Sequence, residues 1–125
     1  MAETQKKTVL IAEDDNSLVN ILKSRLEAMG IVVVTAGTGQ QALNIIKNKT
    51  PNLVLLDIML PGGMNGFDVM EQMKSHPTQK QIPVMVLTNL DTEQKTALDI
   101  GAIDYIVKPN ISIDEVILKI KNNLG

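Results

Sequence analysis

The chain contains no cysteine and no tryptophan, and its aromatic side chains are limited to one phenylalanine and one tyrosine. Without cysteine, neither a disulfide framework nor a thiolate metal site can form, which suits the reducing cytoplasm. So few aromatic rings provide no platform on which nucleic-acid bases could stack. No apolar run approaches the roughly 18 residues that span a bilayer, and the polar start of the chain lacks the apolar stretch of a signal peptide. We therefore expect a cytoplasmic protein without membrane insertion.

An excess of charge of one sign is also lacking. The 12 lysine and arginine residues and the 14 aspartate and glutamate residues give a net charge of -2, and the basic residues are scattered along the chain. No basic patch therefore predicts direct binding of nucleic acid. The chain has 125 residues, of which 44% are hydrophobic and 21% charged, which is typical of one globular domain. We expect a single domain over residues 1–125.

What the chain does contain is a short apolar run followed by a helical pattern, five times over. The runs predict strands at residues 8–12, 31–35, 53–57, 84–88 and 104–107. Strict alternation of strands and helices predicts parallel strands joined by right-handed crossovers, with helices on both faces of the sheet. Five units are too few for an eight-fold barrel. We therefore expect an α/β fold with an open, doubly wound sheet of five parallel strands.

The helical patterns also predict where individual helices lie. The first is expected to bury apolar residues spaced by three and four, namely Leu18, Ile21, Leu22, Leu26 and Met29. The second should start near Gly39, and the third should follow Gly66. The fourth is expected over residues 92–100, with Asp91 or Thr92 as its N-cap. The last begins with residues 112–115, Ser-Ile-Asp-Glu, which fits a capping box.

One expected strand runs directly into a carboxylate. Residues 53–56 are all apolar, and Asp57 follows them, with Pro61 and two glycines a few residues later. An ionised carboxylate that is buried without a partner is very costly. We therefore expect Asp57 at the point where its strand leaves the sheet, close to groups that can pair with it.

Polar side chains also stand at the ends of three other expected strands: Glu13, Asp14, Asp15, Thr88 and Lys108. In an open parallel sheet, ligands bind outside the carboxyl ends of the strands, so these side chains should meet Asp57 at one edge. Clustered carboxylates repel one another unless a cation neutralises them, and ligands that are all oxygen favour Mg²⁺. A carboxylate beside a hard cation, with Lys108 as an anion-binding charge and Thr88 as a donor, is equipped to form an aspartyl phosphate.

Each of these features also has a simpler structural explanation. Asp57 alone fits a turn residue, residues 13–15 alone fit the cap of a helix, and Thr88 and Lys108 each fit a structural role. Their coincidence at neighbouring strand ends favours a site. For Tyr105, inside the fifth expected strand, the spacing is equally compatible with buried packing and with a switch between two positions.

The pattern as a whole resembles the receiver domain of two-component response regulators, including the single-domain regulators of chemotaxis. The resemblance rests on Glu13 and Asp14, on Asp57 with Pro61 four residues later, on Thr88, and on Tyr105-Ile106-Val107-Lys108-Pro109. It covers essentially the whole chain. It implies a flavodoxin-like (βα)5 fold with strand order 2-1-3-4-5, an order that comes from the family and not from the residues.

The resemblance also implies roles for these residues. A sensor histidine kinase or phosphotransfer protein would donate a phosphoryl group to Asp57. Asp14 and Asp57 would bind Mg²⁺ directly, together with the backbone carbonyl of Met59, and Glu13 would act through water. Thr88 and Lys108 would contact the phosphoryl oxygens. Asp15 is left as a helix cap.

Output is the remaining implication of the resemblance. Movement of Thr88 and Lys108 would carry Tyr105 from an outward to an inward position, and the Lys108-Pro109 peptide bond would be cis. The surface of the fourth helix, fifth strand and fifth helix would then bind a downstream protein. The domain itself would be a monomer or would form a dimer when phosphorylated. The domain would not be an enzyme beyond its own phosphorylation and dephosphorylation. Whether it is a complete regulator or part of a longer one is left open.

Three departures from the family pattern and two alternative functions remain. The segment from Pro61 to Gly66 is one residue longer than is usual in the family, and the segment of residues 88–101 is about two residues shorter. Asn89 stands where the family usually has a small residue after the threonine. Gly37-x-Gly39-x-x-Ala42 matches a dinucleotide-binding pattern, which would leave the acids, Thr88 and Lys108 unexplained. The other alternative is a receiver-like interaction domain that is not phosphorylated.

Overall fold

The computed structural model describes residues 6–108 and 111–125. Its sheet has five parallel strands in the order β2-β1-β3-β4-β5, which confirms the predicted fold class and the order implied by the family. The strands are β1 (Thr8–Ala12), β2 (Val32–Ala36), β3 (Leu53–Leu56), β4 (Val84–Thr88) and β5 (Asp104–Val107). The second expected strand was placed one residue too early, and Asp57 lies just past β3 instead of within it.

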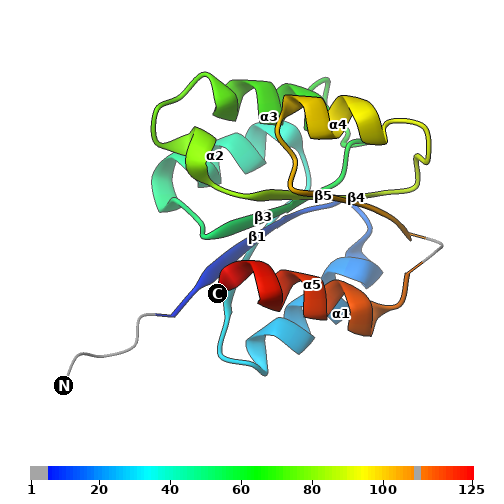
Figure 1. Cartoon of the computed structure of the whole chain (residues 1–125). Helices are drawn as coiled ribbons and strands as arrows, with labels where there is room; N and C mark the ends of the chain where they lie inside the picture. Colours follow the sequence, from blue (N-terminus) through cyan, green and yellow to red (C-terminus); the bar gives the residue numbers. More distant parts are fainter. Residues whose placement is uncertain (1–5, 109–110) are drawn as a thin grey trace.

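The helices in this described part of the chain are α1 (Asn16–Glu27), α2 (Gly39–Lys49), α3 (Gly66–Lys74), the short 3-10 helix η1 (Gln79–Gln81), α4 (Gln94–Ile100) and, after the last strand, α5 (Ile113–Leu124). Helices α1 and α5 cover one face of the sheet, and α2, α3 and α4 cover the other (Figure 1). In the part of the chain that the structure describes, no helix has the length and apolar character needed to cross a membrane.

The sheet separates two hydrophobic cores. Alternate residues of the central strands point to opposite faces, so that Leu10 and Leu56 pack on the side of α2 and α3, and Ile11 and Leu55 pack on the side of α1 and α5. Strand β3 is fully buried on both faces, as its uninterrupted apolar sequence predicts. Its end is therefore fixed by packing on two sides.

The buried stripe of α1 differs from the prediction. The helix buries Val19, Leu22 and Leu26, whereas Ile21 and Met29 are 48% and 42% exposed. Apolar residues at this spacing fit two overlapping stripes on the helix. The stripe that faces the sheet is the one centred on Leu22, and it leaves Ile21 on the outer flank.

The predicted caps of the last two helices were partly wrong. Helix α4 begins only at Gln94, and its N-cap is Glu93, whose side chain makes no capping hydrogen bond. For α5, the Ser112 hydroxyl accepts a hydrogen bond from the Glu115 N–H at 3.2 Å, but the Glu115 carboxylate binds that hydroxyl and not the backbone. Only half of the expected capping box is therefore present.

Candidate functional site

Asp57 is held at the end of β3 by contacts on every side. Its backbone N–H donates to the Ala12 carbonyl at 3.0 Å, which continues the pairing of β1 and β3 for one more residue. Its side chain is 5% exposed. Oδ1 accepts a hydrogen bond from the Met59 N–H at 3.0 Å, and Oδ2 lies 3.0 Å from Lys108 Nζ. The expectation that the carboxylate meets a partner where the strand ends is confirmed.

Glu13 occupies the matching position after β1. Its N–H donates to the Ala36 carbonyl, and its Oε2 accepts from the Asp15 N–H at 3.0 Å. Oε1 is buried and forms an ion pair with Lys108, whose Nζ lies 2.5 Å away. Glu13 therefore depends on Lys108 for compensation of its buried charge.

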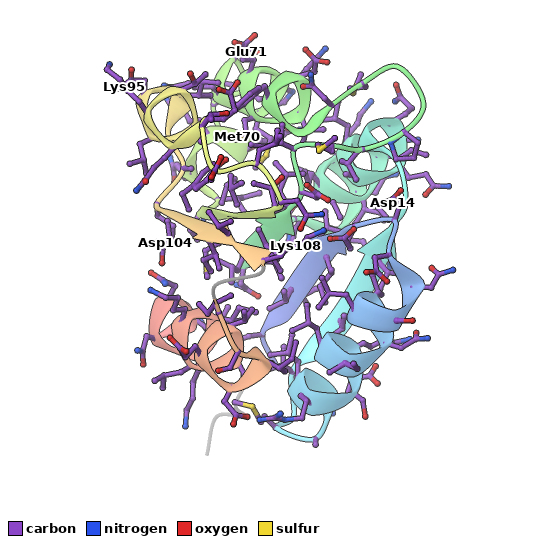
Figure 2. All side chains as sticks on the ribbon, turned by 90° about the vertical axis from the view of Figure 1, so that its right-hand side faces the viewer. Asp14, Met70, Glu71, Lys95, Asp104 and Lys108 are labelled. Atoms are coloured by element: carbon purple, nitrogen blue, oxygen red, sulfur yellow. The ribbon has the colours of Figure 1, made fainter. Side chains whose placement is uncertain are left out.

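Asp14 and Asp15 have separate places, as the sequence suggested. Glu13, Asp14 and Asp57 each present a carboxylate oxygen within 4.8 Å of the others. Asp15 instead caps α1, and its Oδ1 accepts from the N–H groups of Ser17 and Leu18. Figure 2 shows Asp14 after β1 and Lys108 at the end of β5, on the same edge of the sheet.

One ammonium group therefore pairs with two of the three clustered carboxyl groups. Burial raises the pKa of Glu13 above its usual range, although the Lys108 ammonium and the Asp15 N–H oppose this effect. Burial alone would lower the pKa of Lys108, but Glu13 and Asp57 outweigh it and raise that pKa above the ordinary value. Lys108 is therefore held as a cation, and the cluster carries surplus negative charge.

The donor set fits a hard divalent cation. All three clustered side chains offer carboxylate oxygens, and their negative charge exceeds the single positive charge of Lys108. Mg²⁺ prefers oxygen ligands and commonly uses one or two carboxylates together with water. These residues can hold such an ion, and no other cluster of three or more possible metal-binding side chains occurs in residues 6–108 and 111–125.

Thr88 and Tyr105 are joined through the backbone of one residue, Leu90, which the sequence did not point to. Thr88 ends β4 and is fully buried, and its hydroxyl accepts from the Leu90 N–H at 3.4 Å. The Tyr105 hydroxyl donates to the carbonyl of the same Leu90. Tyr105 is 9% exposed, and burial raises its pKa. The tyrosine therefore lies in the packed, inward position, and its role as a switch stays a prediction.

A shallow hollow borders the site on the side of the β3–α3 loop. Its lining includes Asp14, Met59, Pro61, Phe67 and Leu90. Met59 is 56% exposed at this hollow. The predicted cis peptide bond before Pro109 lies outside the described residues.

Comparison with known proteins identifies the family. The family model described as the response regulator receiver domain matches residues 9–121. The chain is 39% identical over 109 residues to the probable transcriptional regulator ycf27 of Cyanophora paradoxa, covering 86% of this chain and 44% of that protein. It thus spans less than half the length of this relative.

Solved structures agree. The non-phosphorylated HemR receiver domain of Leptospira biflexa superimposes with a TM-score of 0.85 at 32% identity, covering 96% of this chain and 95% of that one. The receiver domain of the sensor histidine kinase PA1611 of Pseudomonas aeruginosa PAO1, which has a magnesium ion in its active site cleft, gives 0.84 at 21% identity and covers 97% and 99%. This chain belongs to the response regulator receiver domains. It is therefore a domain of two-component signalling, as its site residues suggested.

Proposed function

We propose that this domain accepts a phosphoryl group on Asp57 from a sensor histidine kinase or a phosphotransfer protein. The observation that supports this most strongly is the position of Asp57, a buried carboxylate whose Oδ2 lies 3.0 Å from Lys108 Nζ, beside the acidic pair Glu13 and Asp14. A carboxylate held in this way, next to a cation site, is placed to act as a nucleophile.

Mg²⁺ would be held by Asp14, Asp57 and the backbone carbonyl of Met59, with Glu13 acting through water. The bound ion would supply positive charge that offsets the carboxylates and the transferred phosphoryl oxygens. The clustered carboxylates of Glu13, Asp14 and Asp57 suit the binding of Mg²⁺. A solved receiver domain of the same fold holds magnesium in its active site cleft.

In the transfer step, an Asp57 carboxylate oxygen forms a bond to phosphorus while the bond from phosphorus to the donor histidine nitrogen breaks. The electron pair of the broken bond returns to the imidazole. Lys108 then stabilises the phosphoryl oxygens as a point charge. The Thr88 hydroxyl accepts its present hydrogen bond from Leu90, so its own proton is free to be donated to a phosphoryl oxygen.

Phosphorylation would be read at the surface formed by α4, β5 and α5, which would bind a downstream protein. Leu98 of α4 and Leu118 of α5 are exposed apolar residues, as is Ile103, directly before β5. The domain would turn over no separate substrate, and only its own phosphorylation and hydrolysis would be catalysed. The domain would act as a monomer or as a dimer formed on phosphorylation.

Intact-mass spectrometry tests the proposal. With Mg²⁺ and a small phosphodonor, the protein should gain one phosphoryl group, and Asp57→Asn should abolish the gain. Asp15→Asn is the matched control, because it makes the same change in a neighbouring acid, and asparagine caps helices as well as aspartate does. Undiminished labelling of the Asp57→Asn variant would overturn the assignment.

A further inference from the structure

The loop between β3 and α3 turns on two adjacent glycines. Gly62 and Gly63 have φ values of +93° and +86°, in a region of backbone space that residues with a side chain rarely adopt. This is the loop that is one residue longer than the family spacing. Its two left-handed residues fold the following residue, Met64, back against the start of α2.

Helix α2 contacts this loop through Gly39, which has no side chain. A Cβ atom added to Gly39 would lie 2.5 Å from the Met64 carbonyl oxygen and 2.9 Å from Met64 Cγ. A Cβ added to Gly62 would lie 3.6 Å from Thr38 Cγ2, and Thr38 is the N-cap of α2. The blocking atom at Gly39 belongs to the backbone, so no side-chain rotation can relieve the contact. The lengthened loop therefore needs glycine at the first position of α2.

The far end of the loop is fixed to the phosphoacceptor segment. The Gly66 N–H donates to the Ile58 carbonyl at 2.8 Å. A Cβ at Gly66 would lie 2.5 Å from the Asp57 carbonyl oxygen and 2.8 Å from Ile58 Cα. Gly66 is only two residues after Met64 and is in contact with the backbone of Asp57 and Ile58. A displacement of Met64 would therefore also displace Gly66 and the backbone around Asp57.

We propose that Gly39 is a positioning residue for the site: the bare first turn of α2 sets where the lengthened loop lies, and so where Asp57 and the Met59 carbonyl are held. The consequence for Mg²⁺ and phosphorylation rests on the proposed function, whereas the contact itself does not. The glycine pattern that matches a dinucleotide-binding motif is then explained by packing. At Gly39, the Met64 carbonyl oxygen stands where a phosphate would have to approach, and it would repel one.

The test compares Gly39→Ala with Gly37→Ala, two glycines of the same segment. A Cβ at Gly37 would meet only Gln41 Oε1, at an ordinary 3.8 Å. In metal-free protein, NMR should show faster hydrogen exchange at the Gly66 N–H in Gly39→Ala and unchanged exchange in Gly37→Ala. Calorimetric titration should show a Mg²⁺ dissociation constant raised roughly tenfold in Gly39→Ala alone, the scale expected when a residue that supports metal ligands is lost.

Deletion of Gly63 supplies the rescue. It removes the extra loop residue, so Gly39→Ala in the deletion background should match the deletion alone to within about twofold in Mg²⁺ affinity. If Gly39→Ala does not fold, recovery of folding in the combined variant supports the proposal equally. Wild-type exchange and affinity in Gly39→Ala, or a defect that the deletion leaves unchanged, would overturn it. A wild-type protein that is never labelled on Asp57 would contradict the proposed function, while the exchange comparison would still decide the role of Gly39.

Discussion

Charged side chains pair in two very different settings in this molecule. At the carboxyl edge of the sheet, Lys108 lies 2.5 Å from Glu13, and their side chains are only 16% and 4% exposed. Between α1 and α5, Arg25 lies 2.6 Å from Asp114, but these side chains are 48% and 81% exposed. Water screens the surface pair, whereas the buried pair has lost most of its solvation and depends on its partners. The two ion pairs therefore have almost equal N···O distances but contribute very differently to the free energy of unfolding.

The difference shows what the edge of the sheet is for. The surface pair is balanced, with one cation and one anion, and it could be lost at little cost. The edge instead gathers Glu13, Asp14 and Asp57 around the single ammonium of Lys108. Such an arrangement stabilises the fold less than apolar packing would. It is the kind of local conflict that marks a functional site.

The largest expected effect is on stability at the edge. Lys108→Met leaves Glu13 and Asp57 buried without a cation, so the free energy of unfolding without metal should fall by about 3–5 kcal/mol. Urea denaturation at neutral pH measures it. A loss no larger than that of a surface ion pair would break the comparison between the two settings.

Asn89 offers a kinetic effect next to the same edge. It is exposed after Thr88, and on steric grounds we expect it to shield phosphorylated Asp57 from the attacking water. Asn89→Ala should then shorten the phosphoryl lifetime up to about tenfold, which corresponds to about 1.4 kcal/mol in the barrier. Adding Met59→Ala should shorten it further.

Phosphate release after removal of the donor measures this lifetime. Asn48→Ala, an equivalent change at an exposed position of α2, is the control. The N-cap of α4 is Glu93, so Asn89 has no capping role that would change stability instead. An unchanged or longer lifetime in Asn89→Ala would defeat the shielding hypothesis.

Because the cluster carries surplus negative charge, Asp14→Asn should stabilise the metal-free protein and weaken the stabilisation that Mg²⁺ provides. Asp14→Asn removes one repelling charge, so the metal-free melting temperature should rise by roughly 1–3 °C. The same change removes a ligand, so stabilisation by added Mg²⁺ should shrink. Thermal melts with and without Mg²⁺ measure both effects. A metal-free variant that melts below the wild type would contradict the crowded-carboxylate account.

Tyr105 allows a pH measurement without interference, because the chain has one tyrosine and no tryptophan. Burial raises the pKa of this phenol in the fold above the unfolded value of about 10. Its contribution to stability is therefore fully present below the unfolded pKa and is lost as pH rises through the folded one. The phenolate absorbance should appear at higher pH in native protein than in protein unfolded by guanidinium. Coincident curves would show that Tyr105 is not held inward.

The smallest expected effect is at the surface. In a double-mutant cycle of Arg25→Gln and Asp114→Asn, the coupling free energy should be about 0–1 kcal/mol and should decrease with added salt. Denaturation in low and high salt measures it. Coupling of several kcal/mol would erase the contrast with Lys108.

The side chains of the candidate site could be found from the sequence because parallel strands end at one edge of the sheet. Asp57, Thr88 and Lys108 each stand at a strand end, and the structure brings Lys108 within 3.0 Å of Asp57. Backbone contacts were missed. Leu90 joins Thr88 to Tyr105 through its backbone N–H and its backbone carbonyl, and its side chain takes no part, so no residue type indicates the link.

The packing of individual helices could not be predicted where the sequence is compatible with more than one arrangement. The stripe of α1 was assigned to include Ile21, because periodicity shows that a helix has an apolar face but not which of two overlapping stripes meets the sheet. Gly39 was interpreted only as the start of the second helix and as part of a dinucleotide-binding pattern. Its contact with Met64 depends on how a loop elsewhere in the chain folds, and local spacing carries no information on that.

The central claim is that, of the acids at this edge, Asp57 alone accepts the phosphoryl group. It is tested most directly by phosphorylating the wild-type protein with a small phosphodonor and Mg²⁺, reducing the acyl phosphate with borohydride, and mapping the modified residue by peptide mass spectrometry. The account predicts modification at Asp57 and none at Glu13, Asp14 or Asp15. Modification at one of those three acids, or at none of the four, would contradict it.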